Sequence, residues 1–120
     1  MLLVPKILIV DDDQVNLYLL ELLLSEEYEV IKFFNSFDVI DYLKKERADL
    51  VISDLSMPGL DGFQLLEETK RINPGIPFLF LSAQVDDECI RKAEKLGSTG
   101  YLFKPVDFKM LFDHIEKAIK

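Results

Sequence analysis

Short apolar runs alternate with longer segments of helical spacing along this chain. Five runs are short and rich in apolar or β-branched residues, at Lys6–Val10, Glu29–Phe33, Leu50–Ser53, Phe78–Leu81 and Gly100–Phe103. Four of them show no apolar–polar alternation, which is typical of strands that are buried on both faces. The run at Glu29–Phe33 is more mixed, and we expect it to form an edge strand.

The segments between these runs predict five amphipathic helices. The segment Gln14–Leu24 has apolar residues at the spacing i, i+3, i+4, i+7, i+8, and we expect this stripe to face the core. The stripe consists of Val15, Tyr18, Leu19, Leu22 and Leu23. Similar stripes predict helices around Val39–Leu43, Phe63–Ile72, Ile90–Leu96 and Phe108–Ile119.

Residues at the predicted helix ends agree with these helices. Asp13, Asp61, Asp86 and Asp107 can act as N-caps, because a short side-chain oxygen can accept a hydrogen bond from a first-turn N–H. Gly97 can end the fourth helix in a left-handed conformation.

Five strands that alternate with five helices predict an α/β fold with a doubly wound parallel sheet and helices on both faces. The chain has no internal repeat or flexible linker, so we expect residues 1–120 to form one domain. In such folds ligands bind at the carboxyl ends of the strands, where the strand order reverses.

Composition and charge narrow the functional classes. The chain has 120 residues, of which 49% are hydrophobic and 30% charged, and its single cysteine, Cys89, cannot form an internal disulfide. No apolar run approaches the ~18 residues of a membrane span. The apolar amino terminus lacks a basic leading region, so we interpret it as a strand and expect a cytoplasmic location without membrane contact. The net charge of −8 argues against direct binding of nucleic acid.

Acidic residues stand at the ends of two strands that we expect to be neighbours. Asp11-Asp12-Asp13 follow the first strand and Asp54 follows the third. At ~4 Å, two carboxylates repel by about 4 kcal/mol at an effective dielectric near 20. Such a cluster takes up protons or binds a cation, and oxygen ligands without a cysteine or histidine cluster favour Mg²⁺.

The other two strand ends add groups that suit phosphoryl chemistry. Lys104 offers a positive charge and Ser82 a hydroxyl, and both suit the oxygens of a phosphoryl group in transfer. Asp54 is the best candidate nucleophile, because it stands on a central strand beside the acids of the first. These residues predict phosphorylation of an aspartate.

With these residues in order, the chain resembles the CheY-like receiver domain of two-component response regulators over essentially its whole length. The matching segments are ILIVDDD, LVISDLSMPGLDGF, FLFLSA and GYLFKP. The resemblance implies a flavodoxin-like sheet with strand order 2-1-3-4-5. It also implies a phosphorylation-dependent switch that accepts a phosphoryl group from the phosphohistidine of a histidine kinase or a histidine phosphotransfer protein. Such a domain is not a conventional enzyme, although it promotes its own phosphorylation and dephosphorylation.

The resemblance also implies roles for residues of the phosphorylation site. Asp54 corresponds to the phospho-acceptor. Asp11 and Asp12 correspond to the acidic pair that holds Mg²⁺, or Mn²⁺ in its place, together with Asp54 and the backbone carbonyl of Ser56. Lys104 corresponds to the phosphate-binding lysine, in a cis peptide bond with the proline that follows.

Further residues are assigned to switching by the same resemblance. Ser82 corresponds to the switch hydroxyl and Tyr101 to the switch aromatic, while Ser56 and Gln84 tune dephosphorylation. The switch changes the face formed by the fourth helix, the fifth strand and the fifth helix. This face would act on a downstream effector or output domain, or form a dimer on phosphorylation.

Two alternative functions also have to be weighed for these residues. The segment Asp11–Val15 fits the DxDxV pattern of haloacid-dehalogenase-type phosphatases, in which Asp11 would be the nucleophile. The short chain and the unexplained Asp54 argue against that activity. A flavodoxin-like cofactor-binding module is the second alternative, but the acidic loop after the first strand would repel a phosphate group.

Overall fold

The computed structural model describes residues 4–119 of the chain. Its strands form one parallel sheet in the order β2-β1-β3-β4-β5, which confirms the expected topology. The strands are β1 (Lys6–Val10), β2 (Glu29–Phe33), β3 (Leu50–Ser53), β4 (Phe78–Ser82) and β5 (Gly100–Phe103). Strand β4 is one residue longer than predicted, so Ser82 is its last residue.

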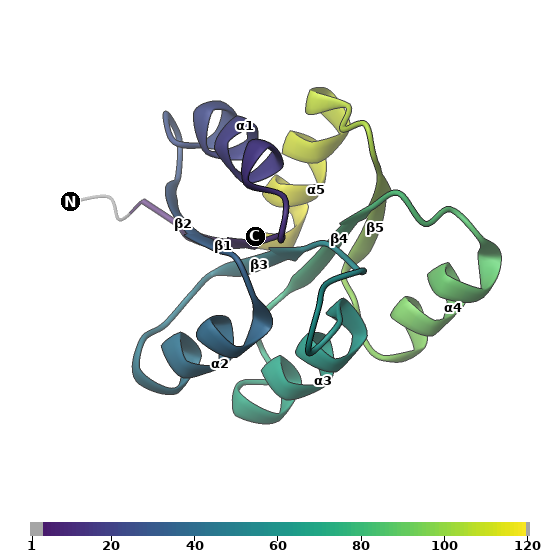
Figure 1. The fold of residues 1–120 in the computed structure, drawn as a ribbon. Coiled ribbons are helices and arrows are strands. Elements are labelled where there is room, and N and C mark those ends of the chain that lie inside the picture. Colours follow the sequence, from purple (N-terminus) through teal and green to yellow (C-terminus); the bar gives the residue numbers. More distant parts are fainter. Residues whose placement is uncertain (1–3, 120) are drawn as a thin grey trace.

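Helices cover both faces of this sheet. Helices α1 (Gln14–Leu24) and α5 (Phe108–Ile119) lie on one face, as Figure 1 shows. Helices α2 (Ser36–Lys45), α3 (Gly62–Ile72) and α4 (Asp87–Lys95) lie on the other. Each layer of helices encloses its own apolar core against the sheet. The predicted doubly wound arrangement is therefore confirmed.

Burial of the strands agrees with the sequence except at β5. Strands β1, β3 and β4 are almost fully buried, and β2 is a partly exposed edge strand as expected. Strand β5 is the other edge of the sheet, and Phe103 on it is 47% exposed. The prediction that Gly100–Phe103 is buried on both faces is therefore wrong, because its apolar residues face partly outward at an edge.

The prediction that the apolar stripe of α1 faces the core is also wrong. Four of its five residues are at least half exposed, namely Val15, Tyr18, Leu19 and Leu22. The buried side chains are instead those of Leu17, Leu20 and Leu24. Since α1 has apolar residues on both sides, two stripes satisfy helical spacing, and spacing alone does not choose between them.

The predicted helix ends are confirmed. Asp13 accepts hydrogen bonds from first-turn N–H groups, Asp61 forms a capping box with Gln64, and Asp86 caps α4. Gly97 has a positive φ of 98° after α4. Among the described residues, no helix is both long and apolar enough to cross a bilayer.

Candidate functional site

Three carboxylates meet at the carboxyl ends of β1 and β3. Asp11, Asp12 and Asp54 each offer a ligand oxygen, and these oxygens lie within 4.8 Å of one another. The topology explains their meeting, because β1 and β3 are paired neighbours with Val10 beside Ser53. The Asp54 N–H donates to the Val10 carbonyl at 3.0 Å. This hydrogen bond extends the pairing of β3 with β1 by one residue and holds Asp54 beside the end of β1.

Asp11 is buried, and both of its carboxylate oxygens accept hydrogen bonds. Its side chain is only 4% exposed. Oδ1 accepts the Asp13 backbone N–H at 2.9 Å. Oδ2 accepts both the side-chain amide of Asn16 at 3.0 Å and Lys104 Nζ at 2.9 Å. A buried carboxylate needs such donors, and the charged lysine is the strongest of them.

The Asp54 carboxylate has fewer hydrogen-bond donors than that of Asp11. Its Oδ1 accepts the Leu55 N–H at 2.8 Å, and its Oδ2 lies 3.4 Å from Lys104 Nζ. Burial and the charge of Asp11 raise the pKa of Asp54, and Lys104 offsets only part of this rise. The arrangement thus concentrates negative charge that a cation can relieve, and its carboxylate oxygens suit a hard ion. The described residues therefore offer a cluster that could hold a metal ion.

Lys104 contacts the carboxylates of both Asp11 and Asp54. It follows β5 and precedes a cis peptide bond to Pro105, as expected. Burial alone would lower the pKa of Lys104, but its hydrogen bond to Asp11 and the charges of Asp11 and Asp54 outweigh burial and raise this pKa. Lys104 is therefore a fixed positive charge beside Asp54.

The two expected switch residues meet the same backbone segment. The buried Ser82 hydroxyl accepts the Gln84 N–H at 3.0 Å. The Tyr101 hydroxyl donates to the Gln84 carbonyl at 2.6 Å, and its ring packs beside Phe80 and Phe103. Residue 84 thus links both side chains in this structure.

Comparison with known proteins agrees with this geometry. Residues 7–116 match the family described as the response regulator receiver domain. The chain belongs to this family. Its function is that of a phosphorylation-dependent signalling switch, and the matches give no support to the phosphatase alternative.

Relatives of the receiver domain differ greatly in length. Transcriptional regulatory protein ZraR of Salmonella typhimurium is 37% identical over 94% of this chain and 26% of its own length. Sporulation initiation phosphotransferase F of Bacillus subtilis is 33% identical over 95% of this chain and 93% of its own. A crystal structure of a response regulator receiver domain protein from Clostridium thermocellum has a TM-score of 0.89 at 32% identity, covering 96% of this chain and 94% of that one. This chain thus spans about a quarter of ZraR and nearly all of the Bacillus protein.

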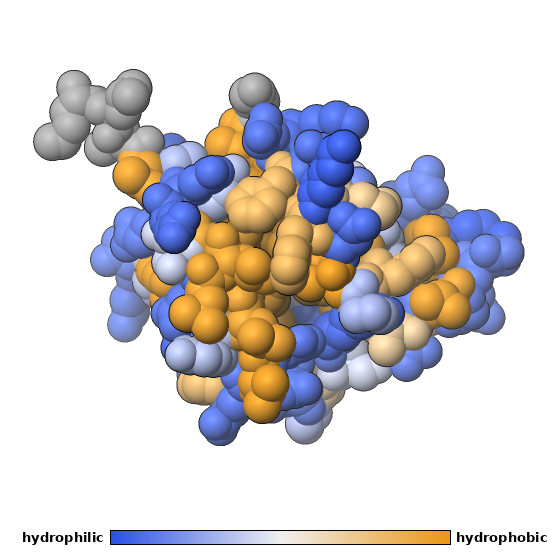
Figure 2. Space-filling model, turned by 90° about the horizontal axis from the view of Figure 1, so that it is seen from above, coloured by the Kyte–Doolittle hydropathy of each residue, from blue (hydrophilic) through white to orange (hydrophobic). Residues whose placement is uncertain are grey.

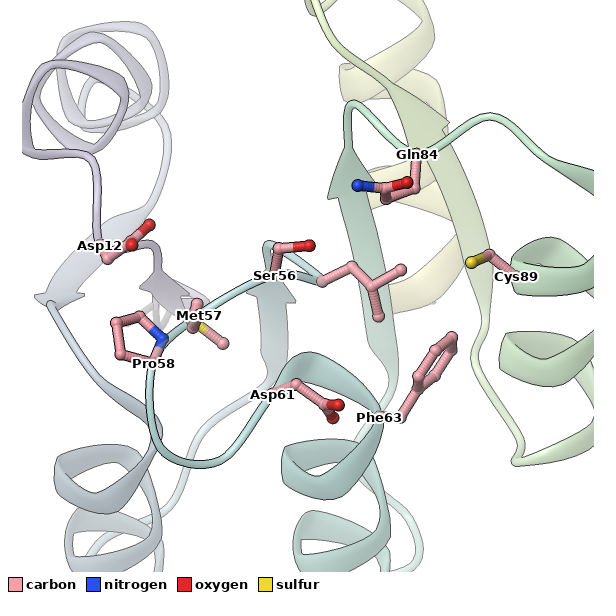
Figure 3. A pocket seen from close by; sticks show the side chains of 9 residues that line it. Asp12, Ser56, Met57, Pro58, Asp61, Phe63, Gln84 and Cys89 are labelled. Atoms are coloured by element: carbon pink, nitrogen blue, oxygen red, sulfur yellow. The ribbon is translucent and has the colours of Figure 1, made fainter.

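An open hollow of about 590 Å³ lies beside the carboxylates of the receiver domain. Figure 3 shows Asp12, Ser56 and Gln84 around it, on three different loops. The two residues expected to tune dephosphorylation therefore border one space next to a candidate metal ligand.

A second cavity, of about 370 Å³, separates α1 from the loop after β5. We call it the α1 groove, and its walls are formed mainly by Asn16, Leu19, Leu20, Leu22, Leu23, Lys104, Pro105, Val106 and Phe108. Figure 2 shows the apolar surface on this side of the molecule. The groove extends to the site, since Asn16 and Lys104 both contact Asp11.

Sequence reasoning missed one residue of the site, Asn16. It stands in the first turn of α1, five positions after the carboxylate that it contacts. No spacing rule of the sequence singles it out, because its role depends on how the loop before α1 turns.

Proposed function

We propose that Asp54 of this receiver domain accepts a phosphoryl group from a phosphohistidine on a histidine kinase or a histidine phosphotransfer protein. The observation that supports this most is the place of its side chain, in one cluster with the acidic pair and 3.4 Å from the fixed positive charge of Lys104. Of the clustered carboxylates, only Asp54 is in contact with Lys104 while remaining partly open to solvent.

In the proposed reaction an Asp54 carboxylate oxygen attacks the phosphorus in line. The P–O bond forms as the P–N bond to histidine breaks, and the ring nitrogen keeps the electron pair and takes up a proton. Lys104 offers its charge to the phosphoryl oxygens. A Mg²⁺ ion, or Mn²⁺ in its place, held by Asp11, Asp12, Asp54 and the Ser56 carbonyl would neutralise charge on these oxygens.

Phosphorylation replaces the single negative charge of the Asp54 carboxylate by a phosphoryl group that carries about 1.5 to 2 negative charges and three acceptor oxygens, next to the end of β4. Ser82 then donates its hydroxyl to a phosphoryl oxygen and moves the backbone of residue 84 with it. Because this backbone also holds the Tyr101 hydroxyl, Tyr101 changes its packing and alters the α4–β5–α5 face. The phosphoryl group on Asp54 thus shifts the equilibrium between two conformers of the domain.

Phosphorylation of the receiver domain is reversible. The domain promotes its own phosphorylation and dephosphorylation, and Ser56 and Gln84 tune the access of water to the acyl phosphate through the hollow that they line. Residues 1–120 act as one receiver domain in the cytoplasm, without direct contact to nucleic acid or membrane. Its altered face acts on an effector or output domain, or forms a dimer on phosphorylation.

The phosphohistidine donor covers the α1 groove. The donor must bring its phosphorus to Asp54, and the groove begins at the residues that contact Asp11. Its exposed rim is apolar, with Leu19, Leu22 and Phe108 each at least half exposed. An amphipathic helix of the donor suits such a groove.

The acceptor is tested by incubating the chain with a small phosphodonor and Mg²⁺. The wild type should gain one phosphoryl group per chain that hydroxylamine and alkali release, as expected of an acyl phosphate, and Asp54→Asn should gain none. Continued labelling of Asp54→Asn would refute the assignment. Repeated turnover of a phosphate ester by the wild type would favour the phosphatase instead.

Donor docking is tested separately with a phosphorylated histidine kinase that labels the wild type. Leu22→Arg should lower the ratio of the kinase-dependent rate to the small-donor rate by tenfold or more, since one buried apolar contact at an interface is replaced by a charge. An unchanged ratio would place the donor elsewhere.

A further inference from the structure

Asn16 and Lys104 both donate a hydrogen bond to the same carboxylate oxygen of Asp11. The Asn16 side-chain amide donates to Asp11 Oδ2 at 3.0 Å, and Lys104 Nζ donates to the same oxygen at 2.9 Å. The other oxygen, Oδ1, is held by the Asp13 backbone N–H. Oδ2 therefore depends on two side chains that come from opposite ends of the chain.

We propose that Asn16 is a positioning residue that allows Lys104 to leave Asp11 for the phosphoryl group. The inference rests on the proposed function, because it concerns what happens when Asp54 is phosphorylated. Lys104 lies 2.9 Å from Asp11 and 3.4 Å from Asp54 in this structure, so Asp11 is its closer partner. As Lys104 moves from its closer partner, Asp11, toward phosphoryl oxygens on Asp54, its bond to Asp11 weakens or breaks.

Burial makes that exchange sensitive to Asn16. The Asp11 side chain is 4% exposed, so water cannot freely replace a donor that leaves Oδ2. A buried acceptor without a partner costs more than an ordinary hydrogen bond contributes. While Asn16 is present, its amide remains on Oδ2 after Lys104 moves. Without Asn16, movement of Lys104 removes the last side-chain donor from this oxygen.

Asn16 also connects the site to the α1 groove. Its side chain lines the groove together with leucines of α1, while its amide reaches Asp11. A donor helix seated in the groove would contact the residue that controls release of Lys104. The neighbouring Gln14 is exposed on the same turn of α1 and does not line the groove, so it offers a matched control.

The test uses beryllofluoride as a phosphoryl analogue and follows its binding to the 120-residue chain by calorimetry at saturating Mg²⁺. Asn16→Leu, which removes the donor at similar size, should raise the dissociation constant about tenfold, the scale of one hydrogen bond to a charged group. Asn16→Asp, which replaces the donor by a negative charge, should raise it further. Gln14→Leu should remain close to the wild type. Thermal melts of each variant confirm that it is folded.

The same substitutions in a Lys104→Met background separate positioning from a structural role. Without a lysine to release, Asn16→Leu should change the dissociation constant by less than twofold. An equal loss in both backgrounds would overturn the inference and make Asn16 a structural residue. Unchanged binding by Asn16→Leu would overturn it as well. A wild type that binds neither beryllofluoride nor a phosphoryl group would instead refute the proposed function itself.

Discussion

The contact between α3 and the end of β3 makes Gly62 a sharp test of the site's framework. Gly62 is the first residue of α3, and its N–H donates to the Leu55 carbonyl at 2.8 Å. A Cβ atom at this position would lie 2.5 Å from the Asp54 carbonyl oxygen, 2.8 Å from the Phe80 ring and 2.9 Å from Leu55 Cα. Two of these atoms are backbone and the third belongs to a fully buried ring, so no flexible side chain can move aside.

The magnitude for Gly62→Ala follows from two opposing effects. Overpacking of a dense core costs about 1–3 kcal/mol, because side chains and backbone must shift. Replacing glycine by alanine restricts the unfolded chain and returns about 0.4–1 kcal/mol. We expect the free energy of unfolding to fall by about 1–2 kcal/mol, which lowers the melting temperature of a chain of this size by about 4–10 °C.

The same shift displaces the backbone of Asp54, so the rate of its phosphorylation by a small phosphodonor should fall together with stability. Circular dichroism melts measure the first effect and phosphoryl labelling the second. Gly75→Ala is the control, because the nearest atom to its added Cβ is Asn73 Oδ1 at 3.4 Å, an ordinary contact. That control should stay within about 0.5 kcal/mol of the wild type. A Gly62→Ala variant that melts with the control would refute the close packing of α3 on β3.

Three further predictions follow from burial and charge. Leu20→Ala should lower the free energy of unfolding by about 2–5 kcal/mol, whereas Leu19→Ala, at a half-exposed position of the same helix, should lower it by less than about 1 kcal/mol; equal losses in urea unfolding would contradict the buried face of α1. Mg²⁺ at 100 times its dissociation constant should stabilise the wild type by about 2.7 kcal/mol but leave Asp12→Ala unaffected, as thermal melts would show; an equal rise in both would remove Asp12 from the ligands. Asp54→Asn should raise the free energy of unfolding near neutral pH, because burial and Asp11 raise the pKa of Asp54 and so disfavour its charged form; a less stable variant in denaturant titrations would contradict this.

The strand ends could be predicted from sequence because parallel topology converts chain order into position. Once β1 and β3 are neighbours, the residues that follow them meet at one edge of the sheet, and this places Asp11, Asp12 and Asp54 together. Asp54 and Lys104 could be selected because each directly follows a strand. Their roles in phosphoryl transfer remain predictions.

Other features depend on contacts that periodicity does not encode. Helix α1 has two apolar faces, and only its packing against α5 and the sheet decides that Leu17 and Leu20 lie inside while Leu19 lies outside. The Asn16 amide meets Asp11 because of the loop conformation between β1 and α1. The edge position of β5 follows from strand order, which local residue patterns do not show.

The resting contacts of the site also bear on how strongly phosphorylation can drive the switch. Lys104 already has Asp11 as a partner, and the Ser82 hydroxyl already accepts a backbone N–H. If both residues turn to the phosphoryl group as proposed, phosphorylation exchanges hydrogen bonds and does not simply add them. The net driving force is then a difference between similar terms, of a few kcal/mol, which is the range in which both conformers stay populated. The partner of Ser82 is a backbone N–H, which a side-chain substitution cannot remove. Lys104 instead bonds to the side chain of Asp11, and Asn16 donates to the same Asp11 oxygen. Substitutions at Asp11 and Asn16 therefore change this balance most directly.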